Sequence, residues 1–133
     1  MTRVSRKKLL DESHFRAEIA ATSQPLEVFR FALNQARREL HRYHTTGSAA
    51  QDILAANSWL IDRILTAAWI YHAPQEMDSR QSTLLAVGGY GRAELHPHSD
   101  IDLRHIFALE RNEPAPTLRS FLPTLRDLSQ VLR

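Results

Sequence analysis

A run of apolar residues at helical spacing constrains the fold of this chain more than any other feature. Apolar side chains three and four residues apart lie on one face of an α-helix. Such residues follow one another at Phe29, Leu33, Ala36, Leu40 and Tyr43. Pro25 suits the first turn of this helix, and Gly47 can end it. The spacing therefore predicts a helix that begins near Pro25 and buries one apolar face.

A second series with the same spacing follows directly. Ser48 and Gln51 have the spacing of a capping box, in which two side chains satisfy the first backbone N–H groups of a helix. The residues on the expected inner face are Ile53, Asn57, Leu60, Ile61, Ile64, Ala68 and Tyr71. The helix should stop before Pro74, because proline disfavours the helical conformation in the preceding residue. We expect the two helices to form an antiparallel pair, which gives a helical region over residues 25–72.

The residues before this pair carry no motif. Residues 1–24 show no sustained apolar period, and we expect a tail or a weak first helix there. The basic N-terminus is not followed by the apolar stretch of a signal peptide, because Asp11, Glu12 and His14 interrupt it. No run is long enough to span a bilayer. The chain contains no cysteine, which excludes disulfides and fits a reducing compartment. We therefore expect a cytoplasmic protein with no membrane partner.

The charge balance argues against a general nucleic-acid-binding protein. Lys and Arg number 17 and Asp and Glu number 15, so the net charge at pH 7 is only +2. Binding to a nucleic-acid backbone normally needs a concentrated basic surface. We expect no nucleic-acid partner.

After a polar loop, the pattern changes from helix to strand. Residues 83–87 form a short apolar run that Gly88 and Gly89 follow at once, which is typical of a buried strand ending in a tight turn. Residues 100–107 predict a second strand. A last amphipathic helix is expected near the C-terminus, over residues 118–132.

Asp100 and Asp102 are the leading candidates for a functional site. Residues two apart in a strand point to the same side, so the two carboxylates would lie together and repel one another. A divalent cation removes that repulsion, and hard oxygen ligands of this kind suit Mg²⁺. The alternative is an Asp pair at a solvated strand edge or turn, which an isolated D-x-D pattern also fits.

The two glycines add a second element to this pattern. At Gly88 and Gly89 the backbone can approach a triphosphate closely and aim N–H groups at its oxygens. An ordinary hairpin-type turn is the alternative. Neither the dinucleotide-binding fingerprint nor the P-loop motif is present in the chain.

Together these residues carry a specific resemblance. Residues 88–103 read GGYGRAELHPHSDIDL, and this signature segment resembles that of the bacterial P-II uridylyltransferases, members of the polymerase-beta-like nucleotidyltransferase superfamily. One position departs from the family pattern, with Ala93 where glycine is usual. The upstream region, residues 29–71, is more loosely similar to the N-terminal helices of that family.

The resemblance implies both a fold and a reaction. The fold would be α+β, with the N-terminal helical pair followed by an incomplete polymerase-beta-like α/β sheet, and residues 83–133 would be a partial nucleotidyltransferase domain. The reaction would be Mg²⁺-dependent transfer of UMP from UTP to a tyrosine of the P-II nitrogen regulatory protein, with release of pyrophosphate. Asp100 and Asp102 would be the catalytic, metal-binding carboxylates.

The same resemblance assigns residues to the nucleotide. Gly88 and Gly89 would approach its phosphates, and Ser99 would donate a hydrogen bond to a phosphate oxygen. Arg92 is a candidate for a bidentate phosphate contact, and a salt bridge to Glu94 is an equally good interpretation.

Several features depart from the family. Arg104 and His105 stand where a buried strand would continue with aliphatic residues, and the family's third metal carboxylate is expected beyond Arg133. His96 and His98 resemble a metal site but fit the loop signature better. We therefore expect a fragment that is inactive alone. The alternatives are a non-catalytic remnant that binds nucleotide or a partner protein, and a related transferase with another substrate, such as an adenylyltransferase.

Overall fold

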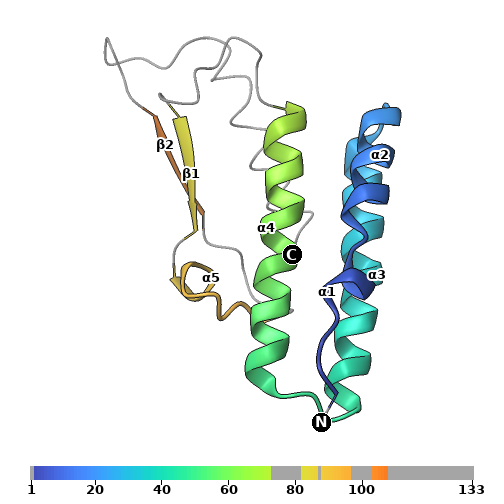
Figure 1. Ribbon diagram of the computed structural model, residues 1–133. Coiled ribbons are helices and arrows are strands. Elements are labelled where there is room, and N and C mark those ends of the chain that lie inside the picture. The colour runs from blue at the N-terminus through green and yellow to red at the C-terminus, as the bar shows by residue number, and fades with distance from the viewer. Residues whose placement is uncertain (1, 73–81, 87, 97–102, 108–133) are drawn as a thin grey trace.

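Helices make up most of the structure. The computed structural model describes residues 2–72, 82–86, 88–96 and 103–107. Its main helices are α1 (Arg6–Leu9), α2 (Glu12–Ala21), α3 (Pro25–Thr45) and α4 (Ala50–His72). Two strands, β1 (Ser82–Ala86) and β2 (Leu103–Phe107), and one helical turn, α5 (Gly88–Gly91), complete the described elements. Figure 1 shows α1 and α2 along α3, and the strand pair on the side of α4 away from α3.

The two predicted long helices and their antiparallel pairing are confirmed (Figure 1). Every residue assigned to the inner face of α3 is buried, and so is every one assigned to α4 except Tyr71, which is 40% exposed. The centre of the interface is fully buried, at Phe29, Leu60 and Ile64. Burying one large aliphatic or aromatic side chain contributes about 1.5–3 kcal/mol. The apolar stripes therefore determine how the two helices pack.

The turn between α3 and α4 follows from Gly47. Its φ of +83° is the left-handed conformation that glycine adopts without a steric penalty. The N–H of Ser48 donates to the Tyr43 carbonyl at 3.0 Å, and the Gly47 N–H donates to the His44 carbonyl at 3.3 Å. This is the hydrogen-bond pattern of a Schellman cap. The hydroxyl of Ser48, predicted to act in a capping box, donates instead to the Thr2 carbonyl at 2.6 Å.

Residues 1–24, expected to be a tail or a weak first helix, contain two helices packed on the core. Asp11 caps α2 by accepting a hydrogen bond from the His14 N–H at 3.3 Å. The side chains buried by this segment are Leu9, Leu10, Phe15 and Ile19. A sequence period does not reveal them because α1 is one turn long and α2 buries only two residues, four positions apart.

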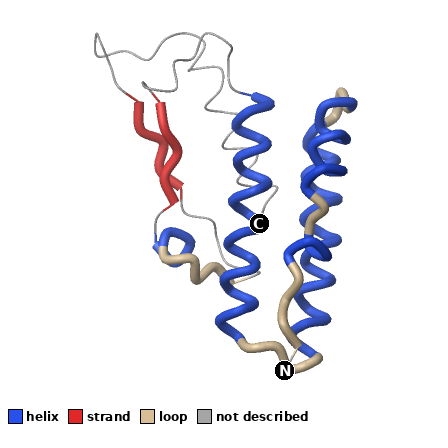
Figure 2. The backbone as a smooth tube through the Cα atoms, viewed as in Figure 1, coloured by secondary structure: helices blue, strands red, loops and turns tan. Residues whose placement is uncertain are grey.

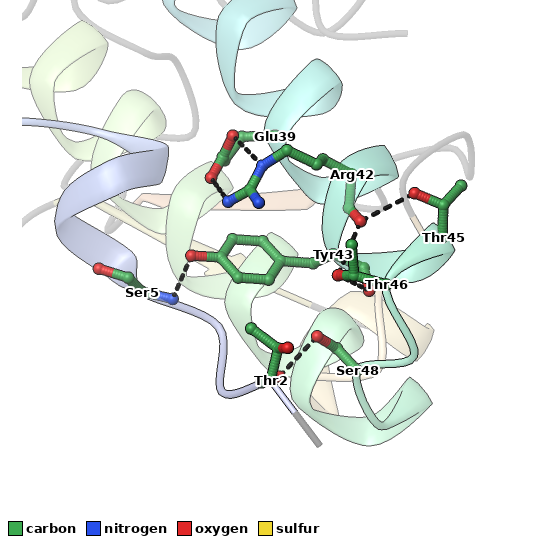
Figure 3. Close-up of polar contacts among 8 residues, drawn as sticks. All are labelled: Thr2, Ser5, Glu39, Arg42, Tyr43, Thr45, Thr46 and Ser48. Carbon is green, nitrogen blue, oxygen red and sulfur yellow. Dashed lines mark hydrogen bonds and ion pairs between the residues drawn. The ribbon is translucent and has the colours of Figure 1, made fainter.

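Polar contacts around Tyr43 fasten this N-terminal segment to α3 (Figure 3). The Tyr43 ring is 2% exposed, and its hydroxyl accepts a hydrogen bond from the Ser5 N–H at 3.2 Å. The guanidinium of the adjacent Arg42 donates to both carboxylate oxygens of Glu39, about one turn earlier on α3, which lowers the pKa of the Glu39 carboxyl. Arg42 also lies over the Tyr43 ring, 4.9 Å from its centroid. A buried tyrosine thus keeps a partner for its polar end.

The predicted fold class is wrong. We expected an α+β fold in which a nucleotidyltransferase α/β sheet follows the helical pair. Among the described residues, β1 and β2 pair only with each other, antiparallel, with Ser82 opposite Phe107 and Ala86 opposite Leu103 (Figure 2). The described core is helical, because all but two of its buried apolar residues belong to α1–α4. The two exceptions are Leu10, which lies between α1 and α2, and Leu95. The prediction failed because short apolar runs beside glycines show local extended structure but not which strands pair.

Helix α4 also corrects the statement that no run could span a bilayer. Residues 50–71 have the length and composition of a membrane span, with a mean hydropathy of 1.2. Half of that window is buried inside the protein, and the core helix of a soluble protein has the same properties. Burial against α2 and α3 accounts for the apolar composition of α4.

The burial of α1 makes a prediction about stability. Leu9 is 3% exposed, so Leu9→Ala should destabilise the chain by about 2–4 kcal/mol through lost burial and the cavity left behind. Phe31→Ala, at a position 60% exposed on α3, is the matched control and should change stability by less than about 0.5 kcal/mol. Urea denaturation followed by circular dichroism measures both. Equal midpoints for Leu9→Ala and the parent chain would show that residues 1–10 behave as a tail.

Candidate functional site

The structure describes part of the predicted site. Gly88, Gly89 and Arg92 lie in or directly after α5, at the end of β1. Asp100 and Asp102, the predicted metal ligands, and Ser99 lie outside the described residues. Their placement near the glycines therefore stays a prediction. The structure describes the first half of the signature segment, residues 88–96, and its contacts with the helices.

Gly88 begins a helical turn in place of the expected tight turn. Its φ of +62° requires the left-handed conformation, which glycine adopts readily. The Arg92 N–H donates to the carbonyls of both Gly88 and Gly89 at 3.2 Å, and the Glu94 N–H donates to the Gly89 carbonyl at 2.9 Å. The segment therefore folds back on itself directly after β1.

Gly89 is not required by crowding among the described residues. A Cβ atom built there would lie 3.7 Å from the Glu94 carbonyl oxygen and 3.9 Å from an Arg92 guanidinium nitrogen. Both distances are ordinary van der Waals contacts, so a small side chain fits. The predicted role of Gly89, close approach of its backbone to phosphate, remains untested by this geometry.

Arg92 forms the salt bridge that was one of its two predicted roles. Its Nε lies 3.3 Å from the Glu94 carboxylate, and the two side chains are 66% and 60% exposed. An exposed ion pair of this kind contributes about 0–1 kcal/mol. The guanidinium can therefore exchange Glu94 for a stronger anion at little cost.

Ala93, the position that departs from the family pattern, has a φ of +57°. An L-residue in this conformation brings its Cβ close to the backbone and costs roughly 1–2 kcal/mol, whereas glycine does not. Glycine, which the resemblance led us to expect at this position, would adopt the turn without that cost. The structure shows that alanine here adopts the same turn at an energetic cost.

Two buried polar residues on α4 hold the signature segment in place. The Asn57 side-chain amide donates to the Leu95 carbonyl at 2.9 Å, and the Leu95 N–H donates to the Ser58 hydroxyl oxygen at 3.1 Å. The Ser58 hydroxyl in turn donates to the Leu54 carbonyl at 3.0 Å. Asn57 and Ser58 are 2% and 4% exposed, and the Leu95 side chain is buried at 3%. We call Asn57 and Ser58 the Leu95 clamp.

Sequence reasoning missed the function of this clamp. Asn57 was placed correctly on the inner face of its helix, and a lone amide in an apolar stripe was the available signal. A buried amide needs a partner. That partner is 38 residues away, at a leucine backbone group that no side-chain pattern identifies.

Within the described ranges, no group of three or more His, Cys, Asp or Glu side chains is placed to hold a metal ion. His96, one of the two histidines weighed as metal ligands, is exposed, and its neighbour His98 lies outside the described residues. The metal site predicted at Asp100 and Asp102 is therefore neither supported nor opposed by the described side chains.

The Leu95 clamp predicts a local effect of mutation. Asn57→Leu keeps the size of the side chain but leaves the buried Leu95 carbonyl without its donor, which should cost about 1–3 kcal/mol. Amide hydrogen exchange at Leu95 should accelerate. Thr66→Ala is the control, because Thr66 is exposed and its hydroxyl donates to the Asp62 carbonyl of its own helix. Unchanged exchange at Leu95 in Asn57→Leu would contradict the clamp.

The conformation of Ala93 predicts a stabilising substitution. Ala93→Gly should raise the free energy of unfolding by about 0.5–1 kcal/mol, because relief of backbone strain outweighs the greater freedom of glycine in the unfolded chain. Ala17→Gly, at an exposed position in the middle of α2, should have the opposite sign at a cost of about 0.5–1 kcal/mol. Chemical denaturation of both variants checks the signs, and a destabilised Ala93→Gly would refute the left-handed assignment.

Relatives of this chain share one description. Proteins from Pseudomonas putida and Pseudomonas aeruginosa are 38% and 36% identical over 122 residues, which is 91% of this chain and 13% of each relative. One from Ectopseudomonas mendocina is 42% identical over 96 residues, 72% of this chain and 10% of its own length. Each is a bifunctional uridylyltransferase/uridylyl-removing enzyme. No protein-family model and no solved structure matches the chain.

Proposed function

The chain is homologous over most of its length to a segment of bifunctional uridylyltransferase/uridylyl-removing enzymes, and we propose that it contributes the first part of a uridylyltransferase site. The resemblance read from the signature segment is confirmed at this level. The chain spans about 13% of the length of these relatives, so the reaction, its substrates and its partner are parts of the proposal.

The proposed reaction is transfer of UMP from UTP to a tyrosine of the P-II nitrogen regulatory protein in the cytoplasm, with release of pyrophosphate. The observation that carries it is the match over 91% of the chain to enzymes named for uridylyl transfer. The name of these enzymes implies a uridine nucleotide as donor. The P-II protein as acceptor comes from the signature segment, whose spacer as well as its glycines and D-x-D resembles that family.

In this proposal the chain positions and neutralises a nucleotide. Asp100 and Asp102 would hold Mg²⁺, whose charge stabilises a polyphosphate and the developing charge of its leaving group. Backbone N–H groups near Gly88 and Gly89 would approach the phosphates, with Ser99 as a hydrogen-bond donor. The exposed Arg92 is available to these oxygens because its bond to Glu94 is weak. The Leu95 clamp would fix the segment that precedes the carboxylates.

A second candidate is a segment that binds nucleotide or a partner protein without catalysis. Its support is the signature segment, whose glycines and D-x-D pair suit nucleotide binding whether or not turnover follows. The two candidates differ in turnover but agree on Mg²⁺-dependent nucleotide binding.

Calorimetric titration with UTP, with and without Mg²⁺, tests what the two candidates share. We expect Mg²⁺-dependent binding of UTP, with an affinity at least about tenfold lower in the Asp100→Ala, Asp102→Ala double variant. The variant lacks the proposed ligands of Mg²⁺, whose two positive charges would neutralise the phosphates. Asp11→Ala, which removes a carboxylate that caps α2, is the control for lost negative charge. ATP bound as tightly as UTP would contradict uridine specificity. If no Mg²⁺-dependent binding were found, the site would not be formed in this chain.

A further inference from the structure

The two buried polar residues in the described part of the chain share one partner. Asn57 and Ser58 lie on α4 among apolar side chains, and both hydrogen-bond the backbone of Leu95. The packing of α4 does not require either polar group, because apolar side chains of similar size would bury more apolar surface there. A polar pair on an apolar helix face that packing does not require is a candidate for a positional role.

A series of hydrogen bonds leads from this pair to the glycines of the signature segment. The clamp holds Leu95 by both its N–H and its carbonyl. The preceding residue, Glu94, donates its N–H to the Gly89 carbonyl at 2.9 Å. The Arg92 N–H donates to the same carbonyl at 3.2 Å. Helix α4 is therefore connected to Gly89 and Arg92 through described hydrogen bonds and one peptide link.

This connection is the hydrogen-bonded link that the structure describes between the turn and the helical core. Among the described residues, the strand before the turn, β1, pairs only with β2. Gly88 and Arg92 are exposed, and the ion pair from Arg92 to Glu94 is exposed and weak. An exposed turn with few buried contacts opens or reorients at a small free-energy cost. The attachment of Leu95 to α4 therefore limits how the turn is oriented.

We propose that Asn57 and Ser58 are positioning residues for nucleotide binding, because by holding Leu95 they keep the turn from Gly88 to Arg92 in the orientation that the phosphates need. The inference rests on the proposed function, in which this turn approaches the phosphates of UTP. The two side chains act through the backbone of Leu95 and not by touching the nucleotide. Orientation matters because hydrogen bonds weaken steeply with angle and distance, so a tilted turn loses its contacts with phosphate.

Calorimetric titration of the full chain with UTP and Mg²⁺ tests this role. Asn57→Leu removes the donor to the Leu95 carbonyl and should bind UTP at least about tenfold more weakly than the parent chain. Ile19→Val is the control for lost stability, because it removes a buried methylene group from α2, beside the later part of α4. Its UTP affinity should equal that of the parent. Urea denaturation checks that both variants are folded.

A double variant separates positioning from an independent effect. Gly89→Ala places a methyl group on the turn itself, where a Cβ atom has room, and should weaken UTP binding alone. If the clamp acts through this turn, Asn57→Leu and Gly89→Ala together should weaken binding by less than the product of their separate effects. Independent effects would multiply.

Asn57→Asp gives a readout that lost packing would not produce. The new carboxyl has nearly the shape of the amide, and burial raises the pKa of a carboxyl. Below that pKa it can donate to the Leu95 carbonyl, and above it the carboxylate has no proton to donate. The UTP affinity of Asn57→Asp should therefore approach that of the parent as the pH falls from about 8 to about 5.5. Measuring both at each pH cancels the titration of Glu94, His96 and UTP.

The possible results distinguish this inference from the function on which it rests. Parent-like affinity in Asn57→Leu, an equal loss in Ile19→Val, multiplying effects with Gly89→Ala, or a pH-independent deficit in Asn57→Asp would overturn the positioning role and leave the proposed function intact. Absence of Mg²⁺-dependent UTP binding in the parent would overturn both. If Asn57→Leu does not fold, Asn57→Asp decides, because lowering the pH restores its donor.

Discussion

The hydrogen bonds from Asn57 and Ser58 to Leu95 join the two parts of this structure. Leu95 is the one residue of the described apolar core that comes from the signature segment, and a leucine that enters a core brings its peptide groups with it. Leaving one such group unpaired costs about 1–3 kcal/mol, as much as the burial of the side chain gains. The clamp satisfies both the N–H and the carbonyl of Leu95, so the segment can be held by the helices instead of lying free on them.

The clamp in turn depends on the packing of α4. Asn57 and Ser58 lie on a helix that packs against α3, and α1 and α2 also contact α4. A chain of this size has a modest core, in which each buried leucine or phenylalanine is a sizeable part of the total. The N-terminal residues that carry no motif therefore act on the site indirectly, through the stability of the helix that presents the clamp.

How far the sequence predicts the structure depends on the range of the interactions involved. Helices α3 and α4 were predicted because Phe29 to Tyr43 and Ile53 to Ala68 repeat an apolar period over many turns. Helix α2 was missed because Phe15 and Ile19 are too few to establish a period, and the sheet was wrong because strand partners are chosen at long range. At the site, the motif identified the family, but the partner of Asn57 is a backbone group and leaves no trace in side-chain patterns.

In the described half of the signature segment, some residues are required by the fold and others are not. Gly88 and Ala93 are constrained by backbone conformation, since both have positive φ, and Leu95 is constrained by its contact with α4. Neither constraint applies to Arg92 or Gly89. Arg92 makes an exposed ion pair, and Gly89 has room for a side chain. Residues that a fold does not require are where a motif is most informative about chemistry. On this argument Gly89 and Arg92 are the positions where substitution should alter the proposed nucleotide binding without altering the fold.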